Sequence, residues 1–122
     1  MNKLIPLVIA LCPMFITFNA QAKLENFYNC TMNEGVTAQQ VIALKNDYNA
    51  AAQEAGLDTY SIKVMFPMYG EEQGPGAFAW SGSWESLEDM PQISSWFRAS
   101  KWGAKVLKLM TCENGSLWNV YD

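Results

Sequence analysis

The sequence contains no histidine, and this absence removes the commonest metal ligand and the commonest general base at neutral pH. It also has no dense basic cluster, because only 8 lysines and arginines are spread over 122 residues, with a net charge of −4. Proteins that bind nucleic acid or anionic membranes neutralise phosphates with such clusters. No phosphate-binding loop, nucleophile–base pair or metal-ligand spacing occurs either. We therefore expect no nucleic-acid or membrane-surface partner, no metal site and no cofactor.

Only 3 cysteines are present, and none of them forms a CxxC motif. Cys12 falls in an apolar N-terminal segment, which leaves Cys30 and Cys112. Their wide separation disfavours a redox or metal-binding pair. In an exported chain, two such cysteines indicate one disulfide, which would close a loop of about 80 residues and contribute about 3–5 kcal/mol. We predict a Cys30–Cys112 bridge.

Residues 1–22 have the pattern of a cleavable signal peptide. Lys3 is a minimal positive region, Leu4–Phe18 is an apolar core, and Ala20-Gln21-Ala22 is a small-x-small cleavage pattern. Removing Lys3 from the 8 basic residues leaves 7 against 12 acidic ones, a net charge of −5. The remaining length of about 100 residues suits one small domain. We predict a single domain over residues 23–122 in a periplasmic or secreted protein.

Two alternatives to the signal peptide fit the same segment less well. A transmembrane anchor needs about 18 or more apolar residues, whereas this run is shorter and contains Pro6 and Pro13. A lipid-modified Cys12 would follow a small residue, but the bulky Leu11 precedes it. The cleaved signal peptide is therefore the preferred interpretation.

The stretch Thr59–Trp84 holds two alternating runs separated by a segment rich in Gly, Pro and Glu. In the first run one face carries Tyr60, Ile62, Val64, Phe66 and Met68. In the second run one face carries Phe78, Trp80, Gly82 and Trp84. This period of two predicts the strands of a hairpin, each with one face on a core. Pro67 has no amide hydrogen to donate, so we place the first strand at a sheet edge.

A strand and a helix are predicted before this hairpin. Phe27–Met32 indicates a short strand, although its alternation is weak. Thr37 and Gln40 form a capping box at a helix start, and Gly56 is the expected C-terminal glycine. The apolar stripe between them consists of Val41, Leu44, Tyr48, Ala51, Ala52 and Ala55.

After the hairpin, Pro91 suits the first turn of a second helix, which Gly103 is expected to end. Ala104–Met110 fits either a helical turn or a strand, and the sequence leaves this open. Ser116–Tyr121 predicts a last short strand with Leu117, Asn119 and Tyr121 on one face, opposite Trp118 and Val120.

The predicted order is strand, helix, strand, strand, helix, strand, which is the ferredoxin-like βαββαβ arrangement. We predict an α+β fold with a four-stranded antiparallel sheet and two helices on one face. In this topology the end of the first strand lies beside the beginning of the last. Cys30 and Cys112 occupy those two positions, so the cysteine pair and the strand order agree.

A sheet covered by helices on one face must meet water or a partner on the other. Bulky residues on both faces of the hairpin, among them Met65 and Tyr69, indicate an apolar surface. Such surfaces commonly mark interfaces. We therefore expect a homodimer formed by pairing of sheets.

The chain resembles the dimeric α+β barrel superfamily, which includes NIPSNAP-like proteins and small cofactor-independent monooxygenases. The similarity lies in the strand–turn–helix Phe27–Gly56 with Cys30 and Gly35, and in the hairpin with Met65-Phe66-Pro67 and Ala79–Trp84 leading into Ser86. It also resembles uncharacterised exported proteins of marine gammaproteobacteria. The resemblance implies pairing into a dimeric barrel and a ligand site between sheet and helices. Haem-degrading members match poorly, since they use a histidine.

Residues of the types that such a site uses are Asn29, Tyr69, Trp80 and Trp96, each of which also suits a core or interface position. Because no catalytic signature accompanies them, our first hypothesis is an exported homodimer that binds a small apolar or aromatic ligand, or a protein partner. The alternative is a cofactor-independent monooxygenase or isomerase, which rests on architectural analogy. A purely structural role is not excluded, and the sequence leaves open whether the protein is an enzyme.

Overall fold

The computed structural model of the chain describes residues 23–68, 74–113 and 115–121. The predicted signal peptide and Tyr69 lie outside these residues, so predictions about them stay predictions. Along the chain the elements are β1 (Lys23–Met32), α1 (Ala38–Glu54), β2 (Ser61–Met65), β3 (Ala77–Trp84), the 3-10 turn η1 (Leu87–Asp89), α2 (Met90–Ala99), α3 (Trp102–Leu109), β4 (Met110–Cys112) and β5 (Ser116–Val120).

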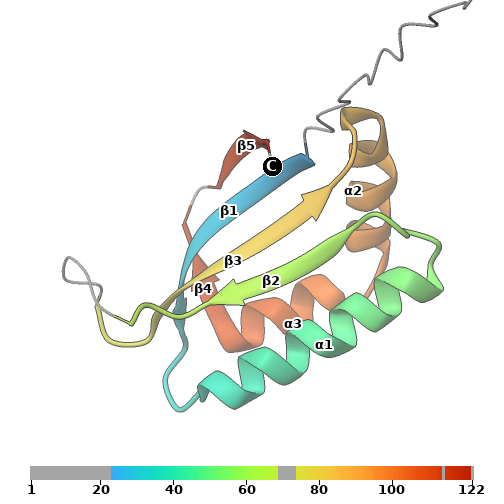
Figure 1. The fold of residues 1–122 in the computed structure, drawn as a ribbon. Coiled ribbons are helices and arrows are strands. Elements are labelled where there is room, and N and C mark those ends of the chain that lie inside the picture. Colours follow the sequence, from blue (N-terminus) through green and yellow to red (C-terminus); the bar gives the residue numbers. More distant parts are fainter. Residues whose placement is uncertain (1–22, 69–73, 114, 122) are drawn as a thin grey trace, which may run out of the picture.

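The strands form one antiparallel sheet in the order β2-β3-β1-β4, and β5 also pairs with β1. This order confirms the ferredoxin-like arrangement and the edge position of the first hairpin strand. Figure 1 shows α1 and α3 on one side of this sheet. β1 begins at Lys23, earlier than the predicted start at Phe27, and β2 ends before Phe66.

The prediction of a four-stranded sheet is wrong, because the last strand is divided into β4 and β5. Both lie along β1, but Cys30 pairs with Cys112 whereas Phe27 pairs with Ser116. Between these pairs β1 contributes two residues and the opposite segment three, so the register shifts by one residue. A shift of this kind exchanges the faces of the side chains beyond it. Trp118 consequently shares a face with Glu25, away from the helices.

The second helical segment also differs from the prediction. It consists of α2 and α3, separated at Ser100, whose backbone is extended. Gly103 lies inside α3 and does not end a helix, so that prediction is wrong. The ambiguous segment after it divides between the two alternatives: α3 continues to Leu109, and β4 starts at Met110.

The start of α1 confirms the capping box. The Gln40 amide donates to the Thr37 hydroxyl oxygen at 3.3 Å, and the Thr37 amide donates to Gln40 Oε1 at 2.8 Å. Gly56 follows the helix with φ +81°, a conformation that favours glycine. The buried residues of α1 come from its predicted apolar stripe; they are Val41, Leu44, Tyr48 and Ala52.

The predicted disulfide is confirmed. Cys30 on β1 and Cys112 on β4 are direct cross-strand partners joined by a 2.02 Å S–S bond. The bond ties the short β4 to the central strand across 82 residues of chain. It therefore holds the end of α3 against the sheet, where the side chain of Met110 is buried.

Candidate functional site

A cavity of about 330 Å³ lies between the sheet and the helices. Its floor is formed by residues of β1, β2 and β3, and its other walls come from all three α-helices and the disulfide. The lining residues are Asn26, Tyr28, Tyr48, Tyr60, Ile62, Trp80, Gly82, Trp84, Met90, Ile93, Ser94, Phe97, Val106 and Cys112. None of these carries a charged side chain. The volume is at the lower end of the range for small-molecule sites.

The cavity exists because α2 does not pack fully against the sheet. Met90, Ile93 and Phe97 turn the apolar face of this helix toward the cavity, yet no residue of α2 is buried. An apolar helix face is normally stabilised by complete burial, at about 25 cal/mol per Å². A molecule that filled the cavity would bury this apolar face of α2.

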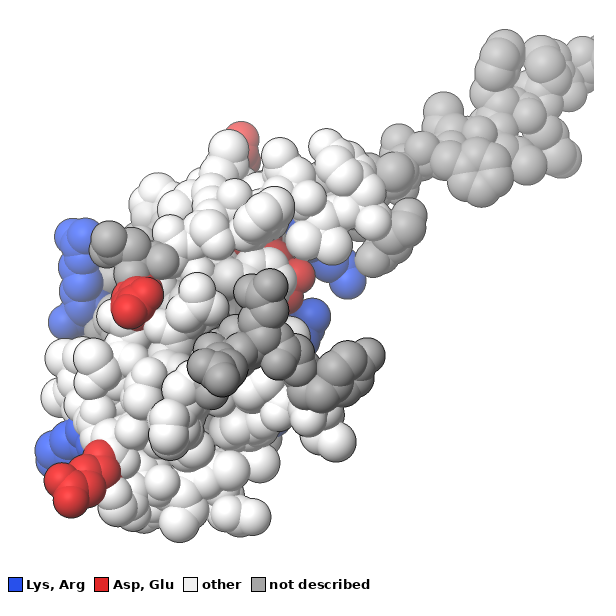
Figure 2. All heavy atoms as spheres, turned by 90° about the vertical axis from the view of Figure 1, so that its left-hand side faces the viewer, with Lys and Arg blue, Asp and Glu red and all other residues white. Residues whose placement is uncertain are grey.

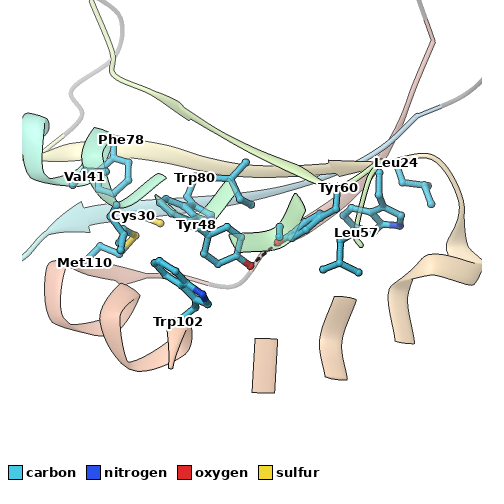
Figure 3. Packing of buried hydrophobic residues seen from close by; sticks show 14 residues of the cluster. Leu24, Cys30, Val41, Tyr48, Leu57, Tyr60, Phe78, Trp80, Trp102 and Met110 are labelled. Atoms are coloured by element: carbon cyan, nitrogen blue, oxygen red, sulfur yellow. Dashed lines mark hydrogen bonds between the residues drawn. The ribbon is translucent and has the colours of Figure 1, made fainter. Parts of the chain in front are cut away.

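Tyr48 lies at the centre of the aromatic cluster behind the cavity (Figure 3). Its ring makes edge-on contacts with Tyr60, Trp80, Trp96 and Trp102, at centroid distances of 6.0, 5.8, 5.2 and 5.7 Å. Edge-to-face pairs of this kind add about 0.5–1.5 kcal/mol each beyond area burial. The wall of the cavity around Tyr48 is therefore closely packed, and Trp96 of α2 takes part in this packing.

The hydroxyl groups of Tyr48 and Tyr60 are 2.9 Å apart and share one hydrogen bond. Both rings are buried, with 2% and 8% of their surface exposed. Burial raises the pKa of Tyr60 from 10.0 to about 12, and burial together with the Tyr60 charge raises the pKa of Tyr48 further. Both groups thus keep their protons at any physiological pH.

Asn49 fixes the position of α1 relative to β2. Its side chain accepts a hydrogen bond from the Ile62 amide at 2.7 Å and donates one to the Ile62 carbonyl at 3.0 Å. Because β2 is an edge strand, these outward backbone groups have no strand partner. These two hydrogen bonds, here called the Asn49–Ile62 clamp, also place Tyr48 opposite Tyr60. Tyr48 directly precedes Asn49, and Tyr60 lies two residues before Ile62.

Gly82 leaves room for Tyr60 on the floor of the cavity. A Cβ atom at this position would lie 3.2 Å from Tyr60 Cε2 and 3.2 Å from Ile62 Cδ1, closer than most such contacts. A glycine inside a strand commonly marks such a close approach. The predicted apolar face of β3 therefore contains a gap that the neighbouring tyrosine ring occupies.

Three further polar groups border the cavity, on Asn26, Tyr28 and Trp84. The Asn26 amide donates to the Tyr28 hydroxyl at 2.9 Å. Trp84 is buried, and its indole Nε1–H has no acceptor among the described residues. A buried donor without a partner costs about 1–3 kcal/mol. The hydrogen-bonding capacity around the cavity is thus incompletely used.

Of the predicted site residues within the described ranges, Trp80 and Trp96 lie close together around Tyr48, whereas Asn29 does not join them. Trp80 lines the cavity, and Trp96 contacts the ring of Tyr48. Asn29 pairs with Ala79 on the opposite face of the sheet and is exposed, while Tyr69 lies outside the described residues. Sequence reasoning missed Tyr48 and Tyr60 as site residues, because both occupied predicted apolar faces and were interpreted as core.

The sheet face away from the helices is here called the open face. Unlike the cavity lining, it carries charged side chains. Glu25 is only 8% exposed there; it accepts a hydrogen bond from Ser81 at 2.7 Å and pairs with Lys63 at 3.5 Å. Exposed Met65 and Trp118 border this polar centre. On the side of the molecule in Figure 2, charged side chains form small separate groups among uncharged residues.

Among the described residues no group of three metal-ligating side chains occurs. No helix of the described ranges combines the length and apolar character needed to cross a bilayer.

Comparison with known proteins gives a structural likeness but no family. No protein-family model matches the chain. No curated protein matches it either. A solved structure from Bacteroides fragilis NCTC 9343, described as a dimeric protein of unknown function with a ferredoxin-like fold, superposes with a TM-score of 0.46 at 14% identity. The match covers 82% of this chain and 96% of that one.

Proposed function

We propose that the protein binds a small, uncharged, apolar or aromatic molecule in the cavity between the sheet and the helices. The observation that carries this proposal is a 330 Å³ cavity whose lining contains six aromatic residues and no charged side chain. Ligand pockets are commonly apolar with few polar groups. A charged ligand would lose its hydration without gaining a counter-charge.

Binding is favoured over catalysis by the character of the groups that line the cavity. Its titratable side chains are tyrosines, and the pKa of both Tyr48 and Tyr60 is raised, away from the range of a general base at neutral pH. Asn29, which the monooxygenase hypothesis places in the site, lies on the open face. Within residues 23–68, 74–113 and 115–121, no arrangement of side chains favours the monooxygenase or isomerase hypothesis.

Calorimetric titration with neutral bicyclic aromatic compounds tests this proposal. Ile93→Trp places a larger side chain in the cavity from α2 and should weaken binding at least about 10-fold, since the ligand and the indole compete for one space. Ile42→Trp makes the same change on the outer side of α1, where Ile42 is 38% exposed, and should leave binding unchanged. Equal affinities of the two variants would place the ligand elsewhere.

We also propose that the open face is the contact of a homodimer. Trp118 is 56% exposed and Met65 41% exposed on this face, and no described helix covers it. Exposed apolar surface of this kind favours association. The solution mass of the wild-type protein should be that of a dimer, and Trp118→Glu should convert it to a monomer. Leu107→Glu, on the exposed side of α3, is the matched control, and a wild-type monomer would refute the proposal.

Export to the periplasm or the medium is the location that we propose. A disulfide within the described chain suits an oxidising compartment, and residues 1–22 have the signal-peptide pattern. Mass spectrometry of the protein recovered from its native host should give a chain that starts at Lys23. Recovery of the chain with Met1 intact would contradict export by cleavage.

A further inference from the structure

We infer that the ligand carries a hydrogen-bond acceptor such as a carbonyl oxygen, and that the hydroxyl pair of Tyr48 and Tyr60 is the donor that selects it. This inference rests on the proposed function, because it assumes that the cavity between sheet and helices is the binding site. It goes further by naming the chemical class of the ligand and the residues that distinguish it from a hydrocarbon of the same shape.

Two tyrosine hydroxyls hold two hydrogens, and the bond between Tyr48 and Tyr60 uses one of them. No other hydrogen bond of either hydroxyl occurs among the described residues. Whichever tyrosine donates to the other, the second retains an O–H that can still donate. Figure 3 shows the two hydroxyls meeting within the aromatic cluster.

Burial keeps both hydroxyls neutral, as their raised pKa values indicate, so the pair remains a donor and does not become an anion. No lysine or arginine lines the cavity, which disfavours a carboxylate or phosphate as the acceptor. A neutral carbonyl or ether oxygen satisfies the free O–H without bringing a charge into the site.

The Tyr48–Tyr60 pair is preorganised by its surroundings. The Asn49–Ile62 clamp fixes α1 against β2, and the missing side chain of Gly82 admits the Tyr60 ring. The donor pair is therefore held before any ligand binds, which lowers the entropic cost of binding. In addition, a hydroxyl that accepts one hydrogen bond donates a second more strongly, because chained hydrogen bonds polarise each other.

The remaining cavity surface suits the rest of such a molecule. Met90, Ile93 and Phe97 of α2 present apolar surface to the cavity. A ring system can contact this helix while its oxygen meets the tyrosine pair. The inferred ligand is thus a small neutral aromatic or alicyclic ketone, aldehyde, ester or ether.

Two probes of nearly the same shape test the inference: 2-acetylnaphthalene and 2-isopropenylnaphthalene, which differ by a carbonyl oxygen in place of a methylene group. Calorimetric titration of the wild-type protein should give about 2- to 10-fold tighter binding of the ketone, the effect of one net hydrogen bond. The Tyr48→Phe/Tyr60→Phe variant should bind the ketone no more tightly than the hydrocarbon. Its affinity for the hydrocarbon should stay within about 2-fold of the wild type.

The double variant is chosen because removing both partners of a buried hydrogen bond is nearly neutral for stability. Tyr121→Phe makes the same chemical change at an exposed tyrosine and should leave the preference intact. Tyr28→Phe removes the other tyrosine hydroxyl that lines the cavity and shows whether that group contributes to the preference.

The outcomes separate the two proposals. If the wild-type protein binds both probes equally, the inference is overturned while the binding function stands, and this result needs no variant. If the double variant retains the preference, the donor has been assigned to the wrong residues, and the Tyr28 hydroxyl or the unpartnered Trp84 indole N–H is the alternative. If neither probe binds, the proposed function itself fails.

Discussion

The hydroxyl oxygens of Tyr48 and Tyr60 lie 2.9 Å apart in the buried interior, although one residue belongs to α1 and the other precedes β2. Tyr48→Phe leaves the Tyr60 hydroxyl buried without its partner, so we expect a loss of about 1–3 kcal/mol in the free energy of unfolding. The double change to phenylalanine should lose less than the two single changes combined. Urea denaturation measures this coupling. Additive losses would show that the two hydroxyls do not depend on each other.

The same pair predicts how stability depends on pH in the alkaline range. The ordinary pKa of tyrosine is 10.0, and burial raises that of Tyr60 to about 12 and that of Tyr48 in the same direction. The unfolded chain therefore releases these protons first, and stability present below pH 10 falls as the pH rises toward 12. The slope reaches at most about 1.4 kcal/mol per pH unit for each tyrosine.

Urea denaturation at a series of pH values from 8 to 11 measures this slope. The Tyr48→Phe/Tyr60→Phe variant is the control, because other groups that titrate in this range remain in both proteins. Its stability should decrease less steeply with pH than that of the wild type. Identical slopes would mean that the two buried tyrosines titrate with ordinary pKa values.

The Asn49 clamp predicts a second loss of stability, at the outer edge of the sheet. Asn49→Ala removes the partner of both the amide and the carbonyl of Ile62, which are partly buried. We expect the free energy of unfolding to decrease by about 1–3 kcal/mol. Gln53→Ala on the exposed side of the same helix should change it by less than about 0.5 kcal/mol. A comparable loss in the two variants would contradict the role of the clamp.

The disulfide predicts a dependence of stability on oxidation. It joins residues 82 positions apart, so Cys30→Ala/Cys112→Ala should lower the free energy of unfolding by about 3–5 kcal/mol. Adding a reductant to the wild-type protein should bring it close to the variant, whereas the variant itself should not respond. Equal stability of oxidised and reduced protein would show that strand pairing alone holds β4 beside β1.

Features encoded by nearby residues could be predicted from the sequence. The capping box of Thr37 and Gln40 depends on four consecutive residues, and the alternation of β2 and β3 depends on the two-residue period of a strand. The disulfide followed from the number of cysteines and from the strand order, since Cys30 and Cys112 occupy the adjacent ends of two neighbouring strands.

Features that depend on how elements pack could not be predicted in this way. The sequence alternation separated Trp118 from Leu117, but only the one-residue shift between β4 and β5 placed Trp118 on the open face. For Asn29, the pairing with Ala79 decided that its side chain lies away from the helices. The segment Ala104–Met110 was compatible with a helix or a strand, and the structure continues α3 to Leu109 and starts β4 at Met110.

By itself, the sequence determined the order of the first four elements, the start of α1 and the cysteine pair, because these depend on local periodicity, capping and parity. Only the tertiary structure decided that Tyr48 and Tyr60 share a hydrogen bond and that α2 leaves a cavity over the sheet. Both depend on the angle and distance at which a helix packs on strands. That geometry is set by all contacting side chains together, so no single stretch of sequence contains it.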